Sequence, residues 1–142
     1  MSYFSQPLLD PQPDECDQPF WKHIRDGWLH FQYCEDCSSY THPPMLHCAR
    51  CGSSRRSWRP APSTGTLFTY TIVYRASHPA VLGNIPYNIV VVEFPECGGV
   101  RLVTNIVDMA GDFRIGMPLE IFMDKDQVPW VPRARVAPAM TK

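Results

Sequence analysis

Apolar and polar residues alternate along much of the chain, and this pattern predicts short β-strands with one helix near the start. Phe20 and Ile24 are four residues apart, so they share a face of the helix that we expect over 18–26. Gly27 is a typical residue to end that helix. Residues 28–34 alternate again and predict a strand. The start of the chain is therefore expected to pair a short helix with a strand.

In the strand expected over 28–34, apolar side chains occupy every second position. Leu29, Phe31 and Tyr33 therefore share one face, and Gln32 points to the opposite face. The strand leads directly into a cysteine motif that begins at Cys34.

Beyond a joint rich in Pro and Gly at 59–65, the pattern is β-like throughout. Five segments rich in β-branched and aromatic residues cover 66–74, 87–94, 100–107, 117–123 and 128–136. The prolines of the last segment confine it to the edge of a sheet. Five short strands with unequal loops predict a small closed barrel, and an OB-fold fits the number and the length best. An SH3-like barrel fits the strand number nearly as well.

Composition and charge narrow the class of protein. A chain of 142 residues with 44% hydrophobic and 19% charged residues can bury a core, as one compact domain or two very small ones. The net charge of −1 argues against a general nucleic-acid binder, which is normally basic. No secretory signal and no apolar run of about 20 residues is visible. We therefore expect a cytoplasmic protein whose thiols stay reduced.

Four cysteines form two Cys-x-x-Cys pairs, Cys34 with Cys37 and Cys48 with Cys51. Such pairs supply four thiolates in the spacing that a tetrahedral zinc ion prefers. Gly52 follows the second pair, where a knuckle often needs a positive φ angle. Because all four ligands come from protein, the predicted zinc is structural and leaves no position for a substrate. Iron bound as in rubredoxin would use the same ligands.

Three histidines lie near the cysteines in the sequence, namely His30, His42 and His47. Any of them could replace a cysteine as a ligand. With four cysteines available, we expect these histidines to lie at the surface or to support the ligands.

The chain resembles the zinc-ribbon/OB-fold proteins classed as domain of unknown function thirty-five. The segments that carry the resemblance are FWKHIRDGWLHFQYCEDC, HPPMLHCARCGS, STGTLFTYTIVYR, YNIVVVEF, GGVRLVTNIVD and IGMPLEIF. Together they span about 20–135. The cysteine pairs are not specific by themselves, but their combination with GTLFTYTIV and IGMPLEI is fairly specific.

The resemblance implies a mainly β fold with three parts: an extended arm with a short helix over 1–27, a rubredoxin-like zinc ribbon over 28–60, and a five-stranded OB-fold barrel with a C-terminal arm over 61–142. It also implies a non-catalytic accessory subunit of a thiolase-like, acyltransferase or aldolase-type acyl-CoA enzyme. Such a subunit organises a hetero-oligomer and helps to place the CoA thioester. CoA or acyl-CoA is then an expected ligand.

Two groups of residues are candidates for these contacts. The first is a basic stretch without acids, whose guanidinium groups could bind the phosphates of CoA: Arg50, Arg55, Arg56 and Arg59. The second is an apolar group that could bind the partner enzyme: Phe20, Trp21, Ile24 and Trp28. The alternatives are a solvated charged face for the first group and packing between ribbon and barrel for the second.

Other classes of function have weaker support in the sequence. Ribbons and OB-folds also bind nucleic acids, and Tyr70, Tyr74 and Tyr87 could stack on bases. A small enzyme or an iron redox protein is a third class. Outside the cysteine pairs the thiols are Cys16 and Cys97. A pair of Cys97 with His78 is conceivable but unsupported, and no phosphate-binding loop, HExxH or GxSxG motif occurs. The sequence therefore favours a binding subunit.

Overall fold

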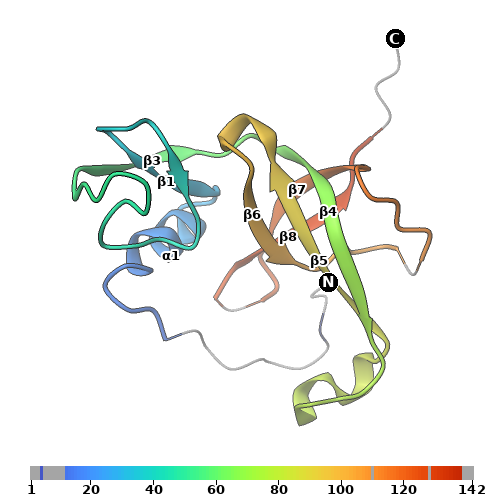
Figure 1. Ribbon diagram of the computed structural model, residues 1–142. Helices are drawn as coiled ribbons and strands as arrows, with labels where there is room; N and C mark the ends of the chain where they lie inside the picture. The colour runs from blue at the N-terminus through green and yellow to red at the C-terminus, as the bar shows by residue number, and fades with distance from the viewer. Residues whose placement is uncertain (1–3, 5–11, 110, 128, 139–142) are drawn as a thin grey trace.

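The computed structural model describes residue 4 and residues 12–109, 111–127 and 129–138. The described residues contain two antiparallel sheets, one α-helix and two 3₁₀-helices. In chain order, the elements are α1 (Gln18–Arg25), β1 (His30–Cys34), β2 (Tyr40–Thr41), β3 (Arg56–Pro60), β4 (Thr64–Val73), η1 (Pro79–Asn84), β5 (Tyr87–Phe94), η2 (Pro95–Cys97), β6 (Val100–Thr104), β7 (Pro118–Asp124) and β8 (Val131–Val136). Figure 1 shows the smaller sheet and α1 on one side of the molecule and the larger sheet on the other.

The smaller sheet has the strand order β2-β1-β3 and forms a ribbon together with the two cysteine loops. Helix α1 buries Phe20 and Ile24, as their spacing predicts. The chain leaves the helix through Gly27, whose φ of +104° is a backbone conformation that glycine adopts readily. The ribbon strand β1 departs from the predicted alternation, because Phe31 and Gln32 are both buried.

The larger sheet has the order β6-β5-β4-β7-β8 and curves into a barrel. A parallel bridge between Ile106 and Ala134 closes it. The N–H of Val107 donates to the Ala134 carbonyl at 2.8 Å, and the Ala134 N–H donates to the Asn105 carbonyl at 3.0 Å. This five-stranded, partly open arrangement is that of an OB-fold, so the predicted fold is confirmed. The Pro-containing β8 lies at one edge of the sheet, as predicted.

One apolar core runs through the ribbon and the barrel. It joins Phe20, Ile24, Leu29 and Phe31 of the ribbon side to the barrel residues, among them Val90, Val92, Phe94, Ile106 and Leu119. The rings of Phe31 and Phe94 meet edge to face with their centroids 5.0 Å apart. The two sheets are therefore held together by continuous packing as well as by the connection at Ala61.

Several element boundaries differ from the sequence prediction. Strand β3 occupies the start of the segment predicted as a joint over 59–65, because it pairs with β1 along its whole length. The third barrel strand ends at Thr104, and the last begins at Val131. After Thr104 the ladder between β5 and β6 is replaced by side-chain bonds, from the Asn88 amide to the Ile106 carbonyl and from the Asn105 amide to the Asn88 carbonyl. The division at 60/61 stays a prediction.

Candidate functional site

The four paired cysteines converge at one end of the ribbon, in two turns of the same design. The Ser38 N–H donates to the Cys34 carbonyl at 2.9 Å, and the Gly52 N–H donates to the Cys48 carbonyl at 2.8 Å. Ser38 has a φ of +61° and Gly52 a φ of +75°, so both turns need a left-handed residue four places after the first cysteine. The prediction of a positive φ at Gly52 is confirmed.

The sulfur atoms lie at the spacing of a tetrahedral metal site. The Sγ atoms of Cys34 and Cys51 are 3.6 Å apart, and those of Cys37 and Cys48 are 3.5 Å apart. All four lie within 4.8 Å of one another. Thiolates bound to a tetrahedral ion at about 2.3 Å would be about 3.8 Å apart. The four residues therefore fit a single metal ion.

The electrostatics of the cluster favour a cation at its centre. The Ser39 hydroxyl and the backbone N–H groups of Cys51 and Arg50 lower the pKa of the Cys48 thiol to about 6. At Cys51 the N–H of Ser53 lowers the pKa, but desolvation and hydrogen bonds with the three other thiols outweigh it and raise the pKa to about 12. Four neighbouring thiolates thus need a positive ion to ionise together. Ser39 carries no motif that would have marked it in the sequence.

No histidine belongs to a metal-compatible group in the part of the chain that the structure describes. His42 packs between Phe20 and Phe31, with centroid distances of 5.1 Å and 5.2 Å. Burial lowers the pKa of His42 to about 4. His30 stacks on His23 with ring centroids 3.8 Å apart, and His47 is exposed. The thiols alone form the site.

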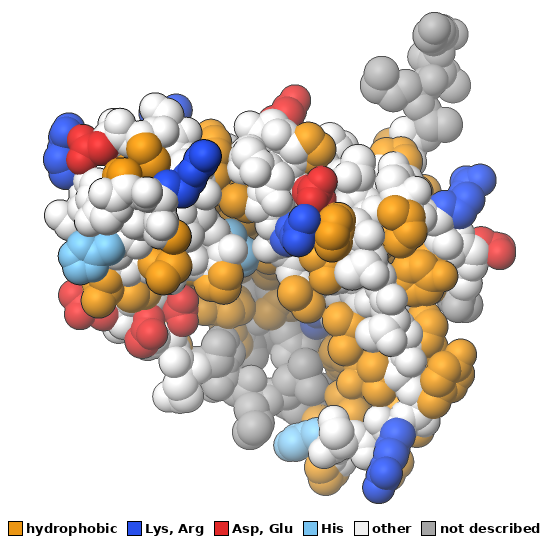
Figure 2. All heavy atoms as spheres, viewed as in Figure 1, with side chains coloured by type: hydrophobic (Ala, Val, Ile, Leu, Met, Phe, Trp, Pro, Cys, Tyr) orange, Lys and Arg blue, Asp and Glu red, His pale blue; other side chains and the backbone are white. Residues whose placement is uncertain are grey.

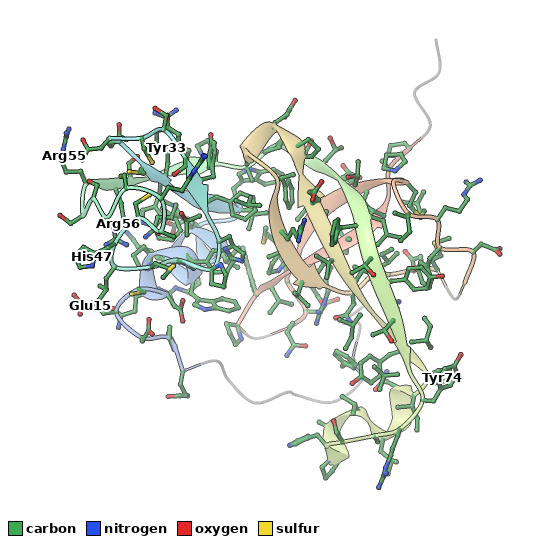
Figure 3. All side chains as sticks on the ribbon, in the orientation of Figure 1. Glu15, Tyr33, His47, Arg55, Arg56 and Tyr74 are labelled. Atoms are coloured by element: carbon green, nitrogen blue, oxygen red, sulfur yellow. The ribbon has the colours of Figure 1, made fainter. Side chains whose placement is uncertain are left out.

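The four arginines proposed as phosphate contacts do not form one cluster. Arg55 is paired with Asp36 at 2.5 Å, and the Arg59 guanidinium lies 3.5 Å from the centroid of the Tyr33 ring. Arg56 points away from Arg55, as Figure 3 shows. Its Nε atom is buried and has no hydrogen-bond partner among the described residues. Arg50 is exposed.

The four apolar residues proposed as a partner interface lie mostly in the chain's own core. Phe20 is 6% exposed and Ile24 is fully buried. Trp28 is half-buried, and its indole N–H donates to the Ala61 carbonyl at 2.9 Å. Trp21 is half-buried and packs edge to face against Phe20. Their positions favour packing between ribbon and barrel, and of the four only Trp21 and Trp28 keep partly exposed side chains.

A groove of about 460 Å³ lies where α1 and the loop that contains Pro43 and Pro44 meet the barrel. Its walls include the apolar Trp21, Pro43 and Leu102, and the cationic Arg101 and Arg133. Sequence reasoning did not group these two arginines, because they come from β6 and β8, which are distant in the chain. Only the barrel closure brings them to one side.

Cys97 and His78 do not form a catalytic pair. His78 precedes η1 and Cys97 ends η2, so they lie beyond opposite ends of the eight-residue strand β5. The His78 Nδ1 accepts a hydrogen bond from the Ala80 N–H at 3.0 Å. Burial raises the pKa of the Cys97 thiol, which weakens it as a nucleophile.

None of the helices in the described ranges has the length and the apolar character needed to cross a bilayer.

The chain is similar to a protein-family model and to a curated protein. A family model described as "ChsH2, C-terminal OB-fold domain" matches residues 58–124. A probable enoyl-CoA hydratase alpha subunit of Thermomonospora curvata is 37% identical over 114 residues, which cover 78% of this chain and 34% of that protein. The chain thus spans about a third of the length of that relative.

Two solved structures share the fold. A chain of the structure described as "Ltp2-ChsH2(DUF35) aldolase" superposes with a TM-score of 0.79 and 30% identity, covering 91% of this chain and 100% of that one. A protein of unknown function from the DUF35 family of Sulfolobus solfataricus superposes with a TM-score of 0.61 and 18% identity, covering 87% and 86% of the two chains.

Proposed function

Because the chain belongs to the DUF35-type family of OB-fold proteins, we propose that it is a non-catalytic accessory subunit of an acyl-CoA enzyme. In this proposal it forms a hetero-oligomer with a catalytic subunit of the thiolase superfamily and helps to place the CoA thioester. The one nucleophile–base pair considered from the sequence, Cys97 with His78, is separated by the length of β5, so it gives no support to a catalytic role.

The observation that carries the proposal is the similarity to the Ltp2–ChsH2 (DUF35) aldolase chain. Identity of 30% extends over the whole of that chain, and its description names two proteins in one enzyme. The second relative is described as one subunit of an acyl-CoA enzyme, a probable enoyl-CoA hydratase. Both descriptions support an assembly in which this chain contributes one component.

The metal in the proposal is one structural zinc ion, held by Cys34, Cys37, Cys48 and Cys51. The sulfur spacing supports a tetrahedral ion, and a set of four thiolates leaves no coordination position for a substrate. Zinc would supply folding free energy to the ribbon. Iron would bind the same ligands and would give visible absorbance, whereas zinc would leave the protein colourless. Metal analysis together with a visible absorption spectrum separates the two.

Arg56 is the arginine best prepared for a CoA phosphate. Arg55 and Arg59 already have partners within the chain, whereas the buried Nε of Arg56 has none among the described residues. That Nε has no access to a ligand, so a phosphate would bind the terminal N–H groups of this half-buried guanidinium. In the purified complex, Arg56→Ala should weaken CoA binding about tenfold while Arg55→Ala changes it little. Equal CoA affinity of wild type and Arg56→Ala would remove Arg56 from the proposed site.

The proposal is tested by purifying the tagged protein from its own host under mild conditions. We expect an acyl-CoA enzyme of the thiolase superfamily to co-purify in stoichiometric amount, identified by mass spectrometry. The purified enzyme should lose much of its activity when this subunit is omitted. A clean monomer, or bound nucleic acid in place of an enzyme, would contradict the proposal.

A further inference from the structure

The hairpin of β4 and β5 extends beyond the barrel as an arm, which we define as residues 70–89. Figure 1 shows this arm, with η1 at its tip, projecting from the larger sheet. The structure describes all of these residues, and none of them belongs to the core cluster. The core ends at Leu67 on β4 and at Val90 on β5. The arm is therefore a two-stranded structure outside the core, and the ring of Phe4 packs edge to face on Tyr87 near its base, with centroids 5.2 Å apart.

Both long edges of the arm are also largely unpaired. Strand β7 pairs with β4 only over Thr64–Thr66, and β6 pairs with β5 only over Val90–Phe94. Beyond the bonds of Asn88 with Asn105 and Ile106, the outer part of the hairpin is held by pairing between β4 and β5, from Tyr70 with Val90 to Val73 with Tyr87. A two-stranded hairpin is at best marginally stable in water, and free edges invite pairing with another chain.

The chemistry of the arm is that of a protein interface. Arg75 is the only Lys, Arg, Asp or Glu in 70–89, although such residues make up 19% of the whole chain. Tyr74 is 74% exposed and Leu82 is 65% exposed. Figure 2 shows hydrophobic side chains gathered over the arm and the adjoining barrel. Depletion of charge with enrichment of aromatic residues distinguishes the centre of an interface from ordinary surface.

The apolar surface continues from the arm onto the barrel. The ring of Tyr70 lies 4.9 Å from that of Phe113 in the loop before β7, and Phe68 is 40% exposed. The arm alone provides about 20 residues, and one side of a standard interface contains roughly 20–30. With its base on the barrel, the arm is thus large enough to form a specific interface by itself.

We propose that the arm, with Tyr74 and Leu82 as its anchors, is the surface that binds the catalytic acyl-CoA enzyme subunit. This inference rests on the proposed function, which supplies the partner. The residues at first expected to bind the partner, Phe20 and Ile24, are buried in the core. The descriptions of the two most informative relatives as components of larger enzymes favour a different protein, rather than a second copy, as the occupant.

The test compares three versions of the protein for binding to the co-purified enzyme subunit. The first is wild type, and the second carries Tyr74→Glu and Leu82→Glu. The third is a matched control with Met45→Glu and Leu46→Glu, because these apolar side chains are 48% and 51% exposed on the ribbon. Metal content and the thermal unfolding midpoint verify that each version is folded.

We expect the arm variant to bind the enzyme subunit at least tenfold more weakly than wild type, and the ribbon control to bind as wild type does. If wild type binds the enzyme and the arm variant binds it equally well, the docking surface is elsewhere and only this inference fails. Equal loss in both variants would also overturn it. If wild type binds no acyl-CoA enzyme, the proposed function itself fails.

A second copy as occupant would give a distinct result. Wild type alone would then be a dimer by mass photometry, and the arm variant would be a monomer. That outcome would overturn the assignment of the arm to the enzyme subunit.

Discussion

The ribbon and the barrel are both built from antiparallel strands, but different interactions hold them. The barrel buries apolar side chains from all five strands, including Phe94, Leu119 and Ala134, which are fully buried. The ribbon has only three short strands, and most residues of its two cysteine loops are half-buried or exposed. A module this small cannot obtain its stability from an apolar core alone. The comparison shows why the four thiols lie in the ribbon.

The largest expected effect is on the ribbon, through loss of a thiol. Cys37→Ala should unfold the residues around the two turns, because structural zinc contributes on the order of 10–16 kcal/mol to small zinc domains. Metal analysis and amide hydrogen exchange over 30–60 measure the effect. Cys16→Ala, outside the cluster, is the matched control. A metal-free Cys37→Ala protein that protects its ribbon amides like wild type would contradict the structural role of the site.

The next effect is on the barrel. Phe94→Ala should lower the free energy of unfolding by about 3–5 kcal/mol, because it removes a fully buried ring and leaves a cavity. Denaturant titration measures the change, and Phe68→Ala, at a side chain that is 40% exposed, is the control. Metal content should stay at the wild-type value. A cost at Phe94 no larger than at Phe68 would mean that the shared core contributes little.

The smallest effect is a pH dependence at the contact between ribbon and barrel. The folded state lowers the pKa of His42 from 6.5 to about 4, so it favours the neutral ring. The stabilisation is complete above pH 6.5 and is lost as the pH falls toward 4, by about 3 kcal/mol in total. His42→Phe should lose less stability over this range than His47→Phe, in which the exposed ring is replaced. Parallel curves of stability against pH for the two variants would contradict the assignment of this pH dependence to His42. Any loss of metal in acid affects both variants alike and does not separate them.

Much of the fold could be predicted because its signals are local. The spacing of Phe20 and Ile24 gives the helix, and the cysteine spacing gives the cluster. Gln32 could not be placed in this way. It is buried because the loop after β2 folds over it, and its amide both donates to and accepts from the backbone of Met45 at 3.0 Å. The contact with Met45 satisfies the buried amide of Gln32, and the alternation of apolar and polar residues cannot predict a contact of this kind.

The site residues also divide into those marked by local sequence and those brought together only by the tertiary fold. The four clustered cysteines are close in the sequence and their cluster was predicted, whereas the grouping of the groove arginines and the buried bonds of Arg133 depend on barrel closure. Arg133 donates to the Asn105 side chain at 2.5 Å and lies 3.8 Å from the Asp124 carboxylate. These residues are up to 28 positions apart in the chain. No local motif marks such a set, because each member is an ordinary surface residue type.

The bridge between Ile106 and Ala134 also determines when the barrel can form. Strand β8 is the last strand among the described residues, so the barrel cannot close during synthesis until residues 131–136 have left the ribosome. The cysteine turns need only residues up to about 60, so the proposed metal would be able to bind there earlier. Contacts distant in sequence form slowly, whereas the ribbon is local. Until the barrel strands are available, a metal-bound ribbon would leave Phe31 exposed, because its packing partner Phe94 belongs to the barrel.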